Sequence, residues 1–329
     1  MGATIKQVAE YAGVSTATVS KFLNGARLKE KNEQAVKEAI EILDYKVNSF
    51  ARGLRNNKSM TVGILIPELP SLFATQIISE IENFIMGFGY STIVCDYKSD
   101  RGLEKTKLKF LLNKMVDALV IMPLGLTSED ISDINIPVVF IDRPVEGVAA
   151  DAVFIDNQRS VFEACEYLIE NGHRKIGVLC GPADIYTARE RFLGYKIAME
   201  KHKISVQKEW VRFGEYQVSS GYSMTEEIVE SGITALVATN YELTMGSMIA
   251  LNELNIHIPE KLSFVGFDNQ ELATAVKPKL SVVIQPIYEI GEKVAQLLMS
   301  RLNNEDFKTQ HIELNAALIK MDSVKNISG

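Results

Sequence analysis

The chain has 329 residues, of which 47% are hydrophobic, 23% charged and 8% aromatic, a composition typical of a folded globular protein with two or three domains. No apolar run reaches the roughly eighteen residues of a membrane span, and the N-terminus lacks the apolar core of a signal peptide, so we expect a cytoplasmic protein. The net charge of −7, taken for the whole chain, argues against nucleic-acid binding.

The charge is unevenly distributed along the chain. Residues 1–60 carry seven lysines and three arginines against five glutamates and one aspartate, a balance of +4, whereas the remainder carries −11. A small basic module on a larger acidic body is typical of a chain that approaches phosphate at one end only.

Three short helices are predicted within residues 4–45. Thr4 is a candidate N-cap of the first helix, and Gly13 supplies the left-handed backbone that ends it. Ser15 then caps a second helix over 16–23, and a third follows over 31–43. Two short helices across a glycine turn, braced by a third, form a helix-turn-helix arrangement, although any small three-helix domain has a similar pattern.

The second helix has an apolar and a polar face. Val19, Phe22 and Leu23 are expected to pack inward, and Thr16, Ala17 and Lys21 to project outward. The string from Ala3 to Asn24 resembles the headpiece of the LacI/GalR family of bacterial regulators. This resemblance implies that the three outward residues read base edges of double-stranded DNA. Lys21 can donate to guanine and Ala17 can contact a thymine methyl. Phosphate contacts, caps or helix packing are expected for a further set: Thr4, Ser15, Thr18, Ser20 and Asn24.

A hinge is predicted over residues 48–60. This segment is a marginal helix by itself, but it resembles the family's hinge helix, which forms on operator DNA. The resemblance implies that Leu54 wedges between base pairs and that Arg52 and Arg55 face bases or phosphates; otherwise Leu54 would pack under the core. Val47 stands where the family usually has proline, and Gly53 weakens the helix, so the hinge is expected to depend on the dimer and on DNA.

From residue 61 onward, apolar strands alternate with helical stretches. Strands are predicted at 61–67, 91–96, 118–122, 137–142, 175–181, 235–238 and 262–267, and helices at 73–88, 103–114, 157–171, 187–202, 218–231 and 241–254. Repeated strand–helix units predict an α/β core of two doubly wound lobes, which in this family are of periplasmic-binding-protein type.

The expected domains are a headpiece over 1–47, the hinge over 48–60 and an effector-binding and dimerisation core over 61–329. Within the core, the first lobe is expected at about 61–157 plus 284–312, and the second at about 158–283 plus the C-terminal segment.

Ligands in such folds lie where parallel strands end, in the cleft between the lobes. Asn240 and Asp268 each follow a predicted strand, although Asn240 could be an ordinary helix cap and Asp268 could begin a turn. Tyr216 could stack on a sugar ring or a base. The family resemblance, carried through the core by strings such as 191–195 and 265–269, implies that these three residues, with Arg191 and Phe73, contact the effector.

Two other parts of the cleft are less regular. The stretch 70–74 and Tyr241 depart from the family pattern, which leaves the effector open. Asp142, in Asp142-Arg143-Pro144, could face the cleft or form a structural ion pair.

Neither a metal nor a cofactor is expected. Cys95, Cys165 and Cys180 lie in apolar stretches, which predicts buried reduced thiols, and the four histidines have no ligand-like spacing. No nucleophile–base pair or phosphate-cradling glycine loop emerges, so an enzyme is not expected.

Together these patterns predict a repressor whose affinity for operator DNA changes when a small effector binds between the lobes. A sugar is the default effector; a purine-like molecule or a protein co-repressor is the alternative. We expect a homodimer, because no leucine-heptad tail follows Leu318, and therefore a pseudo-palindromic operator. A solute-binding protein shares the fold but would need an export signal and no headpiece.

Overall fold

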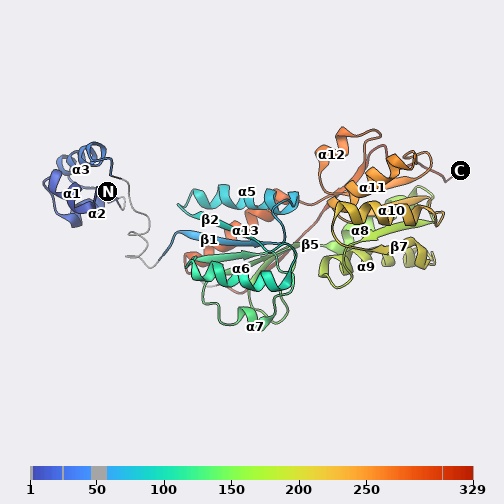
Figure 1. Cartoon of the computed structure of the whole chain (residues 1–329), viewed down its shortest axis with the longest axis horizontal. Coiled ribbons are helices and arrows are strands. Elements are labelled where there is room, and N and C mark those ends of the chain that lie inside the picture. Colours follow the sequence, from blue (N-terminus) through green and yellow to red (C-terminus); the bar gives the residue numbers. More distant parts are fainter. Residues whose placement is uncertain (1–2, 24–25, 46–57, 306, 329) are drawn as a thin grey trace. The chain divides into compact units, whose positions relative to one another are not determined.

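A computed structural model of the chain describes residues 3–23, 26–45, 58–305 and 307–328 (Figure 1). It divides into two compact units, Met1–Met60 and Thr61–Gly329. Within the described residues, no helix combines the length and apolar content needed to cross a membrane.

The described residues of the first unit form three helices: α1 (Ile5–Tyr11), α2 (Thr16–Leu23) and α3 (Glu30–Ile42). Thr4 caps α1 in a reciprocal capping box with Gln7, and Ser15 Oγ accepts from the Thr18 amide at 3.1 Å. Gly13 has a φ of +63°, so the predicted left-handed turn between the helices is confirmed.

A small apolar core holds these helices together. Val8, Val19, Val36 and Ala39 are fully buried, and Phe22 packs against them with other partly buried side chains. The helical faces predicted from the sequence are therefore confirmed. The predicted hinge helix lies outside the described residues.

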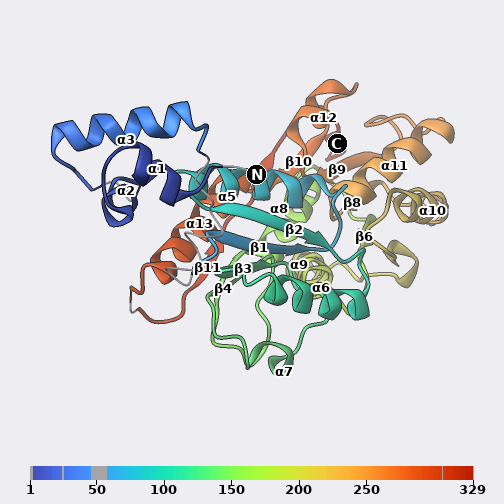
Figure 2. The ribbon, with the colours of Figure 1, turned by 60° about the vertical axis from the view of Figure 1, so that its left-hand side comes forward.

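The second unit contains two lobes, each built on a six-stranded sheet. In the first lobe the strand order is β11-β5-β4-β3-β1-β2, and every neighbouring pair is parallel. The strands are β1 (Thr61–Ile66), β2 (Ser91–Asp96), β3 (Ala118–Ile121), β4 (Val138–Ile141), β5 (Asp151–Ile155) and β11 (His311–Leu314). Figure 2 shows β2, β1, β3 and β4 side by side.

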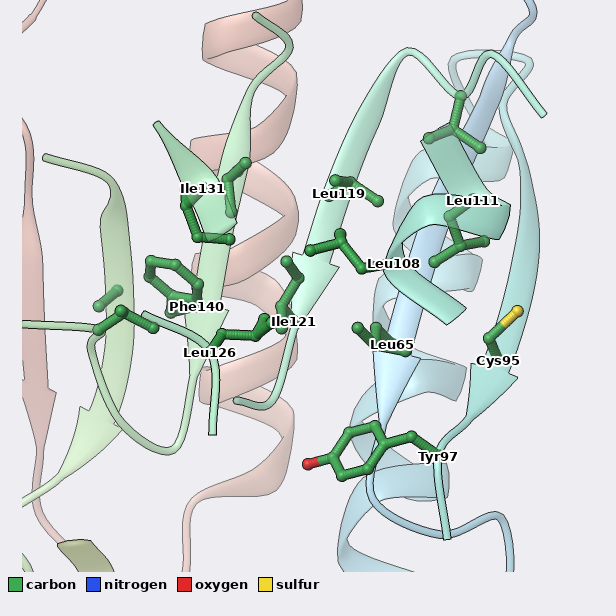
Figure 3. Packing of buried hydrophobic residues seen from close by; sticks show 14 residues of the cluster. Leu65, Cys95, Tyr97, Leu108, Leu111, Leu119, Ile121, Leu126, Ile131 and Phe140 are labelled. Carbon is green, nitrogen blue, oxygen red and sulfur yellow. The ribbon is translucent and has the colours of Figure 1, made fainter. Parts of the chain in front are cut away.

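Helices cover both faces of this first sheet. One face packs against α5 (Leu72–Met86) and α13 (Ile287–Leu302), and the other against α6 (Arg101–Asn113), with the short α7 (Ser128–Ile131) after β3. Figure 3 shows the apolar cluster in which Leu108 and Leu111 of α6 lie near Leu65 and Leu119 of the strands. The apolar strands are buried on both faces, as a continuous apolar run predicts.

The second lobe repeats this architecture with the order β12-β10-β9-β8-β6-β7, parallel except for the β10–β12 pair. Its strands are β6 (Ile176–Cys180), β7 (Val211–Phe213), β8 (Ala235–Ala238), β9 (Ser263–Phe267), β10 (Ser281–Ile284) and β12 (Ala317–Ile319). Its sheet is packed by α8 (Asn157–Glu170), α9 (Tyr186–Lys201), α10 (Val218–Val229) and α11 (Tyr241–Glu253), with the short helices Lys208–Trp210 and α12 (Gln270–Ala275) in connections. The predicted fold class, a helical headpiece and two doubly wound α/β lobes, is confirmed.

The chain crosses between the two lobes three times: from β5 to α8, from β10 to α13 and from β11 to β12. The two lobes are therefore joined by three short segments of chain. These segments limit how the lobes can move relative to each other. The carboxyl ends of the strands in both sheets meet at this junction.

The three cysteines are buried free thiols, as predicted. Burial raises the pKa of the Cys165 and Cys180 thiols far above the ordinary range, so neither forms a reactive thiolate near neutral pH.

Candidate functional site

A cavity of about 330 Å³ lies between the two lobes, at the carboxyl ends of their strands. Its lining comes from both lobes, from the segments after the strands and from the helices that follow them. All five side chains proposed from the sequence for effector contact line this cavity: Phe73 from the first lobe, and Arg191, Tyr216, Asn240 and Asp268 from the second. The fold therefore brings them together, while their contact with an effector stays a prediction.

Arg191, on α9, is held rigidly by the second lobe. Its side chain is only 4% exposed; Nε donates to Asn157 Oδ1 at 2.8 Å and Nη1 donates to the Thr239 carbonyl at 2.5 Å. The guanidinium also stacks on the Phe267 ring, with its carbon 4.2 Å from the ring centre. Such anchoring fixes the position of a positive charge at the cavity wall without a bound ligand.

Asp268 follows β9 in a left-handed conformation, with a φ of +60°. Both of its carboxylate oxygens accept from Gln285 Nε2, at 3.1 and 3.0 Å. Burial raises the pKa of this carboxyl to about 6, although the nearby Arg191 charge and the Gln285 hydrogen bonds oppose the shift. The cavity therefore contains a carboxyl group whose ionised form is poorly solvated by the protein.

Asn240 has a structural role as well as a place in the cavity wall. Its Oδ1 accepts from the Leu243 amide at 2.9 Å and so caps α11, while Nδ2 donates to Glu242 Oε2 at 2.5 Å. The cap interpretation raised by the sequence is confirmed.

Two aromatic rings face the cavity from opposite lobes. Phe73 lies in the first turn of α5, and Tyr216 follows β7. The Tyr216 ring lies directly over Gly181, where an added Cβ would come within 2.2 Å of the ring. Any side chain at position 181, just after β6, would clash with the Tyr216 ring in this position, so glycine is required there.

The first-lobe wall is fixed by buried polar groups. Glu104 of α6 is fully buried and accepts from the Leu124 and Gly125 amides at 2.7 Å each, and Tyr97 donates to the Met122 carbonyl at 2.8 Å. Burial raises the pKa of Glu104, while the two amide hydrogen bonds oppose this shift. These bonds hold the loop after β3, which supplies Met122 and Leu124 to the cavity.

In the headpiece, the structure exposes the outward residues of α2. Thr16, Ala17 and Lys21 are all exposed, as predicted, and so is Ser15. Thr4 is an exposed N-cap, and Thr18 shares a 2.9 Å hydroxyl hydrogen bond with Ser15.

Ser20 is only 8% exposed, which favours helix packing among the roles considered for it. Asn24, Arg52, Leu54 and Arg55 lie outside the described residues.

Comparison with known proteins places this geometry in a family. Residues 4–48 match the model of bacterial regulatory proteins, lacI family, and residues 165–324 match a periplasmic binding protein-like domain. The HTH-type transcriptional repressor PurR of Vibrio vulnificus is 31% identical over 99% of this chain and 100% of its own length. That of Haemophilus influenzae is 32% identical over 99% of each. The chain belongs to the LacI family.

Solved structures agree with this assignment. The lac repressor dimer bound to operator and the anti-inducer ONPF matches with a TM-score of 0.88 at 26% identity, over 99% of this chain and 100% of that chain. The complex of the transcriptional regulator CelR with cellobiose matches with a TM-score of 0.74 at 25% identity, over 98% and 99%. The predicted family is confirmed, and its named relatives are repressors rather than enzymes.

Sequence reasoning missed several cavity residues of this LacI-family regulator. Asp142, for which the sequence left both roles open, lines the cavity and also forms an ion pair, since Arg143 Nη2 lies 3.2 Å from its Oδ2. Arg143 itself lines the cavity and was not predicted. Nε and Nη1 of Arg143 are buried and have no hydrogen-bond partner among the described residues.

Glu68, Glu242 and Gln285 also line the cavity. These three residues follow β1, β8 and β10, and Arg143 follows β4. Their place could have been predicted, because ligands in such folds bind at the carboxyl ends of parallel strands.

Proposed function

We propose that this regulator is a homodimeric repressor of transcription that binds a pseudo-palindromic operator and responds to a small carbohydrate-like effector in the interlobe cavity. The observation that carries this proposal is a cavity lined from both lobes in a chain that also presents an exposed recognition helix. Residues 1–47 would bind DNA, 48–60 would act as the hinge, and 61–329 would bind effector and the partner subunit.

The outward face of α2 would read the operator in the major groove. Lys21 can donate to a guanine edge as a flexible point charge, and Ala17 leaves room for a thymine methyl group. Thr16, in the first turn of α2, lies beside Ala17 on the exposed surface. A two-fold dimer would present two such helices to two half-sites, which requires operator symmetry.

The effector would switch operator affinity by bridging the lobes. A ligand that contacts Phe73 on one lobe and Arg191 on the other binds more tightly to one lobe arrangement than to another, and it shifts the population by that difference in affinity. The three short crossings between the lobes would favour a rotation of one lobe against the other. In the dimer, the rotation would alter the distance between the two headpieces.

A carbohydrate fits the cavity because polar groups and aromatic rings converge there. Fixed donors and acceptors such as Arg191 and Asp268 can bind ring hydroxyls, while Tyr216 can stack on the apolar face of a sugar. One structural relative is a regulator solved with cellobiose. A purine-like effector is the second candidate, because two relatives at 31% and 32% identity are named as PurR repressors.

Thermal-shift screening of neutral sugars, amino sugars and nucleobases separates these candidates. At one hundred times its Kd, an effector stabilises the folded state by about 2.7 kcal/mol. For a core of this size that corresponds to a rise in Tm of roughly 5–10 °C. We expect such a rise with a sugar, and a rise with nucleobases alone would contradict the carbohydrate assignment.

A further inference from the structure

We infer that the effector is an amino sugar, and that Glu242 and Glu68, which line the cavity from opposite lobes, select its ammonium group. The inference rests on the proposed function, since it takes the interlobe cavity as the effector site. It goes further by naming the chemical class of the ligand and the residues that discriminate it.

The first observation is the charge of the cavity. Among its described lining residues are six carboxylates and three guanidinium groups. Two of the arginines are engaged by acids of the same lining: Arg101 pairs with Asp184, and Arg143 with Asp142. The third, Arg191, donates to Asn157 and to a backbone carbonyl. The cavity therefore retains an excess of negative charge, which disfavours phosphorylated or acidic sugars.

Two of the lining carboxylates come from opposite lobes. Glu242 lies in the first turn of α11 and Glu68 follows β1. No ion pair in the described part of the chain involves either carboxylate; Glu242 accepts from Asn240, and Glu68 accepts from Ser99 Oγ at 3.2 Å. Burial raises the pKa of Glu242, and the nearby charges of Asp268 and Glu68 raise it further. A cation between these groups would relieve the repulsion.

The second observation is independent of charge and concerns Gln285, which is 4% exposed and lines the same cavity. Its Nε2 donates to both oxygens of Asp268, and this fixes the amide orientation because the flipped amide would set two acceptors against each other. Oε1 is consequently a buried acceptor without a hydrogen-bond partner among the described residues. An unsatisfied buried acceptor is unfavourable, so a ligand donor that reached Oε1 would be stabilised there.

The acceptors at this end of the cavity match an ammonium group. Gln285 Oε1, Asp268 and Glu242 all accept hydrogen bonds, whereas a hydroxyl has one proton to donate and an ammonium has three. Arg143 also lines the cavity, and its buried Nε and Nη1 atoms are donors that would suit hydroxyl oxygens able to reach them. Tyr216 supplies a ring face for the sugar.

Calorimetric titration of the full-length protein tests the inference. The probes are glucosamine, galactosamine and mannosamine, each compared with its parent sugar and its N-acetylated form at a pH where the amine is protonated. We expect at least one amino sugar to bind at least tenfold more tightly than its parent, a difference of about 1.4 kcal/mol. In Glu242→Gln this preference should fall below about threefold, because the variant loses more affinity for the amino sugar than for its parent.

Two further variants make the result specific. Glu68→Gln, on the opposite lobe, should also reduce the preference for the amine. Because Glu68 lies outside α11, this variant still tests the inference if Glu242→Gln disturbs the α11 cap. Glu271→Gln, exposed on α12 and outside the cavity lining, should leave all affinities unchanged.

Failure of the amino-sugar inference and failure of the proposed carbohydrate effector give different results. Tighter or equal binding of the parent or N-acetylated sugars overturns the inference but leaves the proposed carbohydrate effector intact. Binding of no sugar or amino sugar, with binding of nucleobases, overturns both. Retention of the full preference for the amine in both carboxylate variants overturns the roles of Glu242 and Glu68.

Discussion

Replacing Asp268 with asparagine should stabilise the ligand-free protein at neutral pH and remove a pH-dependent part of its stability. In the folded state burial raises the pKa of this carboxyl from 3.8 to about 6, against the attraction of Arg191. The native fold therefore binds the proton more tightly than the unfolded chain does. Stability from this group is fully present below about pH 4 and is lost as the pH rises through about 6.

The size of the effect follows from the shift. About two pKa units at 1.36 kcal/mol each correspond to about 3 kcal/mol of stability lost when Asp268 ionises. Asparagine cannot ionise, and its Oδ1 can still accept from Gln285. In a core of this length, we expect Asp268→Asn to raise Tm by roughly 5–10 °C at pH 7.5 and by little near pH 4.

Thermal unfolding of the ligand-free protein, followed by circular dichroism between pH 4 and pH 8, measures this directly. The control is Asp133→Asn, an exposed aspartate of the first lobe, which should show no comparable pH-dependent gain. A gain of equal size at every pH, or a loss of Tm at pH 7.5, would show that the protein solvates the ionised Asp268 well. A destabilising charge kept in a cavity is typical of a functional group.

Three further predictions concern DNA and the aromatic wall. Lys21→Ala should weaken specific operator binding by about 10- to 100-fold in fluorescence anisotropy and weaken binding to scrambled DNA far less; equal losses would make Lys21 a phosphate contact. Leu54→Ala should reduce operator bending in a gel circular-permutation assay, and unchanged bending would exclude a wedge role. Gly181→Ala should displace the Tyr216 ring and weaken effector binding at least tenfold, with ligand-free operator binding unchanged; unaltered calorimetric affinity would argue against stacking on that ring.

Strongly patterned elements were predictable from the sequence. The strands at 91–96 and 235–238 have the predicted bounds, and most other predicted elements differ by one or two residues at an end. The strands missed include the partly exposed edge strands β7, β11 and β12, which contain no continuous apolar run. The internal strands β5 and β10 were also missed, and both are short. The helix α13 was also missed, although the sequence indicates it, because Ile290, Val294 and Leu298 recur at helical spacing.

The cavity was only partly predictable. Strand ends and the family resemblance located Asn240 and Asp268, because the carboxyl ends of parallel strands meet at one edge. They could not show that Gln285 fixes Asp268 or that Arg143 retains buried donors without a partner among the described residues. These relations depend on side-chain geometry between segments distant in sequence, which local patterns do not specify.

The central claim is that a ligand in the interlobe cavity changes the affinity of the headpiece for DNA. The most direct test is a fluorescence-anisotropy titration of the full-length protein against an operator selected in vitro, with and without a saturating effector identified by calorimetry. We predict at least a tenfold change in operator Kd, and no such change in Arg191→Ala if that variant no longer binds effector. Effector binding in the cavity that leaves the operator Kd unchanged would contradict the account.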